Sequence, residues 1–188
     1  MHFHPEISSG KINNVTSHTA QYSAIMRPAT KSTQTMDDIR TLRKILGDYK
    51  TIAIVGVSNT THRPSYFAAK YMQHHGYHII PINPRYEEVL GETCYPTLDA
   101  VPQNIDIVDC FRKSEETPEL AKQAVALGAK CLWLQLGVEN DQAKKIATSA
   151  GLDFVSNRCV KIEHARLFGG LGFAGVNTGI VSSRRQTY

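Results

Sequence analysis

The sequence predicts an α/β protein with a Rossmann-like, doubly wound, mostly parallel five-stranded sheet and helices on both faces of that sheet. Apolar runs of strand length alternate with segments of helical periodicity along most of the chain. These runs are nearly continuous in Val, Ile, Leu and Cys, which is typical of strands buried on both faces of a parallel sheet. The expected strands span residues 51–55, 78–82, 105–110, 131–136 and 152–155.

The segments around these strands have the caps and the apolar spacing of helices. A short amphipathic helix is expected from Thr35, with Asp38 at its third position and Gly47 after its end. Thr117 and Pro118 are expected to be the N-cap and the first residue of a later helix. Two further helices are expected over residues 64–75 and 139–150.

This alternation of strands and helices predicts right-handed crossovers between parallel strands. We expect the strand order 3-2-1-4-5, in which the direction of winding reverses between the first and the fourth strand. Ligands of such sheets bind at the carboxyl ends of the strands, beside this reversal. Candidate site residues are therefore those that follow the strands.

Composition divides the chain into three parts. Residues 1–34 are rich in Ser, Thr, Asn, His and Gln, so we expect a flexible N-terminal extension. Residues 35–167 form the expected domain. Residues 168–188 are a Gly-rich C-terminal tail, for which two roles stay open: a cover over the sheet and a contact between the copies of a homodimer.

The net charge of +4 does not describe the folded part of the chain. The 188 residues hold 21 Lys and Arg against 17 Asp and Glu, but residues 37–181 hold 16 of each. The excess of positive charge therefore lies in the tails. A nucleic acid site needs basic groups on the folded body, so this distribution disfavours nucleic acid as a partner.

The sequence favours a cytoplasmic location. No apolar run approaches the roughly 18 residues that a membrane helix needs, so no membrane association is expected. The four cysteines show no CxxC spacing, which favours reduced thiols inside a cell. The first 36 residues are rich in Ser and Thr and nearly free of acidic groups, which leaves the mitochondrial matrix as the alternative.

The first strand runs into a tight turn and then into a helix, an arrangement that suits phosphate groups. A helix N-terminus offers unpaired N–H groups and the positive end of the helix dipole. The dinucleotide fingerprint GxGxxG is absent, because Ser58 and Thr61 stand where glycines are needed. An ordinary loop with exposed polar groups is the alternative. The candidate binding residues here are Gly56, Val57, Ser58, Arg63, Pro64 and Ser65.

The second strand ends in Asn83, Pro84 and Arg85, which discriminate between nucleotide cofactors. An NAD site places an Asp or Glu here, to accept hydrogen bonds from the ribose hydroxyls. A guanidinium instead suits a phosphorylated ribose, as in NADP or coenzyme A. The alternative is that Arg85 forms a surface ion pair with Glu87 or Glu88.

Two later segments add candidates at the same edge of the sheet. After the third strand, Phe111 and Arg112 are suited to contact the flat base and a phosphate of a ligand; alternatively they are a core residue and a solvated cation. After the fifth strand, residues 156–164 are expected to form a turn that carries the thiol of Cys159 near the pocket. We expect no catalytic residues and no metal ligands in this segment, because it lacks a recognised ligand spacing.

Six segments of the chain resemble the small coenzyme A-binding domain proteins, which are similar to the N-terminal domain of the succinyl-CoA synthetase alpha subunit. They lie in order between about residues 48 and 167: GVS, RPSYFAAKY, GYHIIPINP, VDCFR, GAKCLWLQLGV and NRCVKIEH. The resemblance implies a Rossmann-like sheet that binds coenzyme A, with the phosphates over the first loop and helix and the nucleotide end beside the second-strand turn. It singles out Gly56, Ser58, Arg63, Ser65, Asn83 and Arg85.

The expected function is the binding of coenzyme A or an acyl-CoA, without catalysis by this chain. A ligase of the resembling kind needs a further domain with a phosphorylatable histidine, whereas this chain ends about twenty residues after the last matched segment. The pantetheine thiol is suited to form a mixed disulfide with Cys159. The alternative is an NADP-dependent oxidoreductase with Arg85 on the 2′-phosphate, although no Ser/Tyr/Lys constellation is visible.

Overall fold

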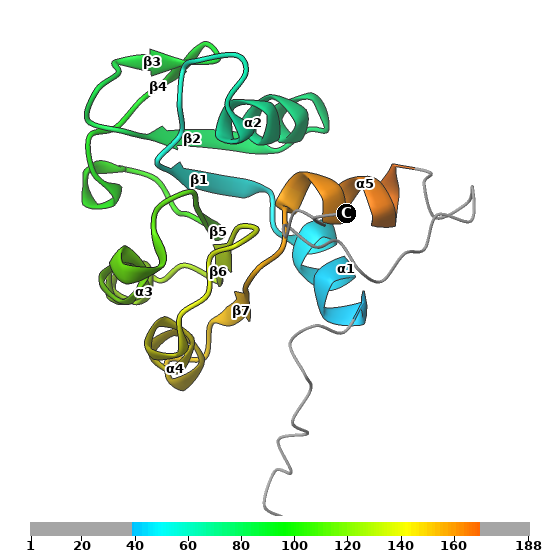
Figure 1. Ribbon diagram of the computed structural model, residues 1–188, viewed down its shortest axis with the longest axis vertical. Helices are drawn as coiled ribbons and strands as arrows, with labels where there is room; N and C mark the ends of the chain where they lie inside the picture. Colours follow the sequence, from blue (N-terminus) through cyan, green and yellow to red (C-terminus); the bar gives the residue numbers. More distant parts are fainter. Residues whose placement is uncertain (1–38, 170–188) are drawn as a thin grey trace, which may run out of the picture. The chain divides into compact units, whose positions relative to one another are not determined.

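The computed structural model describes residues 39–169, which contain a parallel five-stranded sheet (Figure 1). The expected fold class is therefore confirmed. All four strand pairings in this sheet are parallel, and each predicted apolar run contains one strand. The strands are β1 (Thr51–Val55), β2 (His78–Ile82), β5 (Ile107–Cys110), β6 (Cys131–Leu134) and β7 (Asp153–Val155).

The strand order is β2-β1-β5-β6-β7, which is 2-1-3-4-5 in order along the chain. The expected order 3-2-1-4-5 is wrong. The segment between β2 and β5 contains no α-helix; it forms a small antiparallel hairpin of β3 (Glu88–Val89) and β4 (Glu92–Thr93) and the short turn η1 (Leu98–Ala100). The third parallel strand consequently pairs with β1 on the side away from β2, and the winding reverses between β1 and β5.

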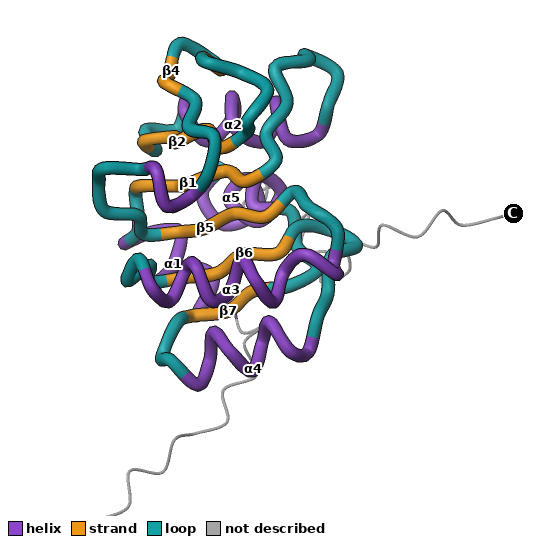
Figure 2. Tube along the Cα trace, turned by 90° about the vertical axis from the view of Figure 1, so that its left-hand side faces the viewer, coloured by secondary structure: helices purple, strands orange, loops and turns teal. Residues whose placement is uncertain are grey.

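Helices cover the two faces of the sheet in separate groups (Figure 2). Buried residues from α1 (Ile39–Asp48), α2 (Pro64–His74) and α5 (Val160–Phe168) form one core cluster with the sheet. Buried residues from α3 (Thr117–Ala126) and α4 (Asp141–Ser149) form the other. Alternate residues of each strand point into the two clusters, because successive side chains of a strand face opposite sides.

Two of the predicted helix starts are not confirmed: one lies outside the described residues, and the other is shifted by one residue. The expected caps of the first helix, Thr35 and Asp38, lie outside residues 39–169, as do residues 1–34 and 170–188. Thr117 is the first residue of α3 and not its N-cap, because the turn η2 (Ser114–Glu116) directly precedes it and Thr117 Oγ1 donates to the Ser114 carbonyl over 2.7 Å.

The segment after β7 is a helix, where the sequence analysis expected a turn. α5 begins at Val160 after the N-cap residue Cys159, and it buries Glu163 and His164. A buried carboxylate is rare unless it is paired. Here Glu163 accepts from Arg158 over 2.9 Å and from Arg166, which makes the buried face of the helix possible. The spacing of Val160, Glu163 and His164 is helical, but the polar residues concealed it.

Candidate functional site

The loop between β1 and α2 begins at Gly56, which only a glycine fits. Its φ of +85° lies in the left-handed region, and a Cβ atom would stand 2.8 Å from Cδ of Arg112 and 3.1 Å from the Phe111 carbonyl oxygen. The loops that follow β1 and β5 therefore touch here, where the winding of the sheet reverses. The space beside Gly56 is filled by the side chain of Arg112.

Two serines close this loop against the start of α2. The Ser58 N–H donates to Ser65 Oγ over 3.1 Å, and the Thr60 N–H donates to Ser58 Oγ over 3.1 Å. Ser65 is buried, so its hydroxyl supports the loop from inside. The N-cap residue Arg63 is extended and makes no side-chain cap, and Pro64 follows at the first helical position. The side chain of Arg63 thus does not compete with a ligand for the N-terminus of α2.

Asn83 ties the loop after β2 to the loop after β1. Its Nδ2 donates to the Val57 carbonyl over 2.7 Å, and its Oδ1 accepts from the Arg85 N–H over 3.0 Å. The Asn83 carbonyl in turn accepts from the thiol of Cys94 at 3.4 Å. Asn83 is therefore a link between two loops, and Val57 is buried beneath it. Sequence reasoning placed both residues at the site but missed this structural role.

Arg63 and Arg85 are exposed on these two linked loops, and Pro84, which precedes Arg85, is exposed as well. Glu87 and Glu88 are also described, and no ion pair joins either of them to Arg85. We call Ser58, Arg63 and Arg85 the cationic corner. Both arginines are exposed, and Arg63 is the N-cap residue of α2, at a helix N-terminus where an anion is stabilised by the helix dipole.

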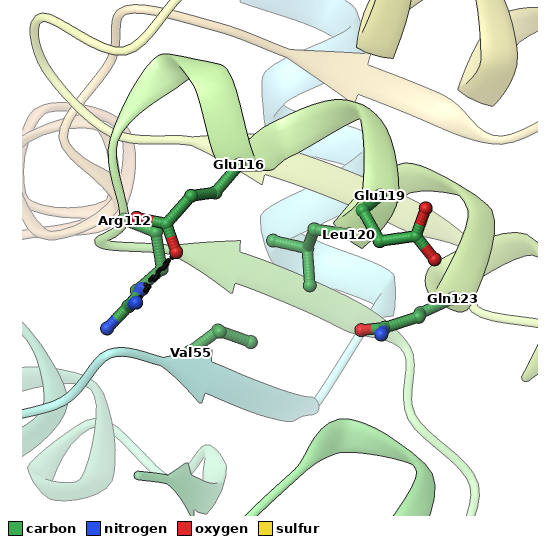
Figure 3. A pocket seen from close by; sticks show the side chains of 6 residues that line it. All are labelled: Val55, Arg112, Glu116, Glu119, Leu120 and Gln123. Carbon is green, nitrogen blue, oxygen red and sulfur yellow. Dashed lines mark hydrogen bonds and ion pairs between the residues drawn. The ribbon is translucent and has the colours of Figure 1, made fainter.

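A pocket of about 320 Å³ lies beside the reversal of winding, on the face that α3 covers (Figure 3). Val55 and Leu120 supply its apolar wall, and Gln123 lies at one end. Arg112 stands at the other end, where Nε and a terminal nitrogen donate to Glu116 over 2.8 and 2.7 Å. Phe111 does not line this pocket; it is half-buried and packs on the core cluster of the opposite face.

A second group of polar side chains lies at the same edge of the sheet, and two of its three members are buried. Asp109 of β5 is fully buried, and its Oδ1 accepts from Gln135 Nε2 over 2.7 Å. Burial raises the pKa of this carboxyl from 3.8 to about 7, although the bond from Gln135 lowers it. Cys159 at the start of α5 is half-buried. We call Asp109, Gln135 and Cys159 the thiol corner.

Burial also raises the pKa of the Cys159 thiol, and the charge of Asp109 raises it further. The backbone N–H groups of Ile162 and Lys161 lower it in part. The thiol is therefore mostly protonated at neutral pH. Sequence reasoning selected Cys159 but missed Asp109, because one acidic residue at a strand end carries no pattern that marks it as buried.

The described part of the chain offers neither a metal site nor a membrane-spanning helix. Residues 39–169 contain no group of three or more His, Cys, Asp or Glu side chains that is placed to hold a metal ion. None of the helices in this part is long and apolar enough to cross a membrane.

Both corners lie within a single match to a known family. The family model described as "CoA binding domain" matches residues 50–165, which include every candidate residue named above. The chain belongs to this CoA-binding domain family. The resemblance stated from the sequence is thereby confirmed at the level of the family.

Relatives of this family include proteins of similar length. The uncharacterized protein YneT of Bacillus subtilis is 36% identical over 124 residues, which are 66% of this chain and 92% of YneT. A solved structure of a hypothetical protein from Pyrococcus horikoshii is 45% identical, with a TM-score of 0.68 over 70% of this chain and 93% of that one. The CoA-binding domain is thus found in small proteins of about its own size.

This chain is also similar to a segment of a large enzyme. An ADP-forming acetate–CoA ligase of Methanocaldococcus jannaschii is 30% identical over 81 residues, which are 43% of this chain but 12% of the ligase. This chain matches a small segment of that enzyme, so the match shows a shared domain.

Proposed function

We propose that this chain binds coenzyme A or an acyl-CoA at the carboxyl edge of its sheet. The family match over residues 50–165 carries the proposal, because it spans both corners of the edge. The nucleotide end of the ligand occupies the cationic corner. The pantetheine arm crosses the end of β5 and brings its thiol to Cys159.

The charges at the cationic corner support this orientation. Coenzyme A carries a pyrophosphate and a 3′-phosphate, and the N-terminus of α2 suits one anionic group through its dipole. Arg63 and Arg85 have exposed guanidinium groups, and a guanidinium can make two parallel hydrogen bonds to a phosphate. We assign the 3′-phosphate to Arg85, since no carboxylate stands at the end of β2 to accept from free ribose hydroxyls.

The pocket between β1, β5 and α3 is the position that we propose for the flat base of coenzyme A. It is open at the reversal of winding, the usual position of nucleotides in doubly wound sheets. Its apolar wall of Val55 and Leu120 suits a ring, and Gln123 suits the polar edge of that ring. This placement replaces the contact with Phe111, whose side chain packs against the other face.

A comparison of ligands by thermal unfolding tests the proposal. Coenzyme A, dephospho-coenzyme A, NADP and NAD are added in turn to the full chain. At 100 times its dissociation constant a ligand stabilises a protein by about 2.7 kcal/mol, so coenzyme A is expected to raise the unfolding temperature by several degrees. Dephospho-coenzyme A is expected to stabilise less, because it lacks the phosphate assigned to Arg85.

Two results contradict parts of the proposal. Equal stabilisation by coenzyme A and dephospho-coenzyme A removes the role of Arg85. Stabilisation by NADP alone contradicts the binding of coenzyme A. It favours the NADP-dependent oxidoreductase, in which Arg85 holds the 2′-phosphate.

The contact between the pantetheine thiol and Cys159 has its own test. Incubation with the disulfide of coenzyme A is expected to give a mixed disulfide: Cys159 Sγ bonds to one sulfur, and the other half leaves as a thiolate that takes up the proton lost by Cys159. Intact-mass spectrometry detects the adduct. An adduct that persists in Cys159→Ala shows that the arm ends elsewhere.

A further inference from the structure

Asp109 has one carboxylate oxygen that nothing satisfies. Among the side-chain oxygens and nitrogens buried within residues 39–169, Asp109 Oδ2 alone has no hydrogen-bond partner. Its other oxygen is held by Gln135, whose side chain is also buried. A buried acceptor without a partner costs about 1 to 3 kcal/mol, so a fold rarely keeps one without a reason.

Asp109 faces the side of the sheet on which α5 begins. In the parallel register Asp109 stands between Ile54 of β1 and Trp133 of β6, and both neighbours belong to the core cluster that contains Val160 of α5. The Trp133 indole N–H donates to the Arg158 carbonyl over 2.7 Å, so the residue before Cys159 is fixed over the same part of the sheet.

The Cys159 thiol is electrostatically coupled to this carboxylate. The charge of Asp109 disfavours a thiolate at Cys159, and two ionised groups at this corner are therefore costly. Protonation of Asp109 removes that cost, and a thiolate at Cys159 is then stabilised by the backbone N–H groups of Lys161 and Ile162 at the start of α5. The free Oδ2 atom is the position for that proton.

We propose that Cys159 and Asp109 form an acyl-acceptor pair that takes the acyl group from an acyl-CoA thioester. This inference rests on the proposed function, because the thioester reaches Cys159 only when the nucleotide end is bound at the cationic corner. Cys159 Sγ attacks the carbonyl carbon, and the proton of the thiol passes to Asp109. The bond from that carbon to the coenzyme A sulfur then breaks, and the leaving thiolate takes the proton from Asp109.

The products are an acyl group in thioester linkage to Cys159 and free coenzyme A, so atoms and charges balance without a further reactant. One thioester replaces another, which requires no external source of energy. The N-terminus of α5 is placed to stabilise the negative charge that develops during the attack. The chain then carries an acyl group.

Acetyl-CoA and the full chain provide the test. We expect the intact mass of the wild-type chain to increase by one acetyl group, and tryptic mapping to place that group on Cys159. Cys159→Ala is expected to show no increase. Cys131→Ala is the matched control, since Cys131 is a buried thiol at the first residue of β6 and lies outside both corners, and it is expected to be acetylated like the wild type.

The role of Asp109 is read from the pH dependence of the acetylation rate. The wild-type rate is expected to rise as Asp109 ionises, with a midpoint near pH 7. Asp109→Asn is expected to slow the reaction about 100-fold, within the range of general bases, and to remove that midpoint. The other titratable or charged groups near the pair are Cys110, Cys131, Lys161 and the ion-paired Arg158 and Glu163, and burial raises the pKa of both cysteines away from this range.

The outcomes separate the two proposals. Thermal stabilisation by coenzyme A without acetylation of Cys159 overturns the acyl-acceptor pair and leaves the binding function standing. A pH profile that is the same in the wild type and in Asp109→Asn makes Asp109 merely structural and overturns its role. If that variant fails to fold, a wild-type profile without a midpoint near pH 7 overturns the role equally.

Discussion

The cationic corner and the thiol corner lie at the same edge of one sheet but differ in every physical respect. Arg63 and Arg85 are exposed and have no ion pair to Glu87 or Glu88, whereas Asp109 is fully buried and held by a single neutral donor. At the first corner both charges remain in water, so they cost the fold little stability. At the second corner, ionisation of the buried Asp109 carboxyl lowers the stability of the fold, because burial disfavours its charged form.

The largest expected effect is at the thiol corner and concerns Asp109→Asn. The folded pKa of Asp109 is raised above the unfolded value, so stability is fullest below about pH 4 and falls as the pH rises towards about 7. Each pKa unit corresponds to about 1.4 kcal/mol, so ionisation of Asp109 costs the wild type about 4 kcal/mol by pH 8. The variant is expected to be more stable than the wild type at pH 8 by a similar amount.

Urea unfolding at pH 5 and at pH 8 measures this difference. If the free energy of unfolding falls equally between pH 5 and pH 8 in the wild type and in Asp109→Asn, ionisation of Asp109 is not what lowers stability. The two corners then do not differ in this respect.

A second large effect is expected from Glu163, which holds Arg158 beside Cys159. Glu163→Gln removes a buried charge that pairs with two largely buried guanidinium groups, and we expect a loss of about 3 kcal/mol in the free energy of unfolding. Glu119→Gln is the matched control, because its pair with Lys122 is exposed and worth under about 1 kcal/mol. Chemical denaturation of both variants is the measurement, and equal losses contradict the prediction.

An intermediate effect is expected from Asn83→Ala at the cationic corner. Two hydrogen bonds are lost, one to the Val57 carbonyl and one from the Arg85 N–H, at about 1 kcal/mol each. We expect about 2 kcal/mol lower stability together with weaker stabilisation by coenzyme A. Calorimetry measures the affinity of the variant for coenzyme A. An unchanged affinity in a less stable variant shows that Asn83 supports the loops but not the binding site.

The smallest effect is expected from Arg85→Gln, and it concerns binding alone. The side chain is exposed, so stability without ligand is expected to change by less than about 0.5 kcal/mol. The affinity for coenzyme A is expected to fall about tenfold, or about 1.4 kcal/mol, while that for dephospho-coenzyme A stays the same. Lys145→Gln on α4 is the control, and calorimetry with both ligands is the measurement. An equal fall for the two ligands contradicts the assignment.

The cationic corner was accessible from the sequence because its signals are local. Gly56 after an apolar strand and Arg85 after the next strand each stand at a position that the βα pattern defines. The thiol corner could be predicted only in part. The sequence indicated Cys159, but Asp109 and Gln135 come together through the pairing of β5 with β6, which no local pattern encodes.

The fold divides in the same way. The apolar runs predicted all five parallel strands, because burial on both faces depends on composition alone. The strand order was wrong, because the side of β1 on which β5 pairs is set by packing among distant segments. α5 was missed as well, since its buried residues Glu163 and His164 are polar and are tolerated only through partners elsewhere in the fold.

Trp133 gives the thiol corner an optical signal of its own. It is the single tryptophan of the 188 residues, it is fully buried, and its indole N–H is bound to the Arg158 carbonyl. Indole emission depends on nearby charges and hydrogen bonds, and here it comes from one place, next to Asp109 in the register. The fluorescence of the unlabelled protein can therefore follow proton movement at Asp109 or the arrival of a ligand at Cys159 in real time.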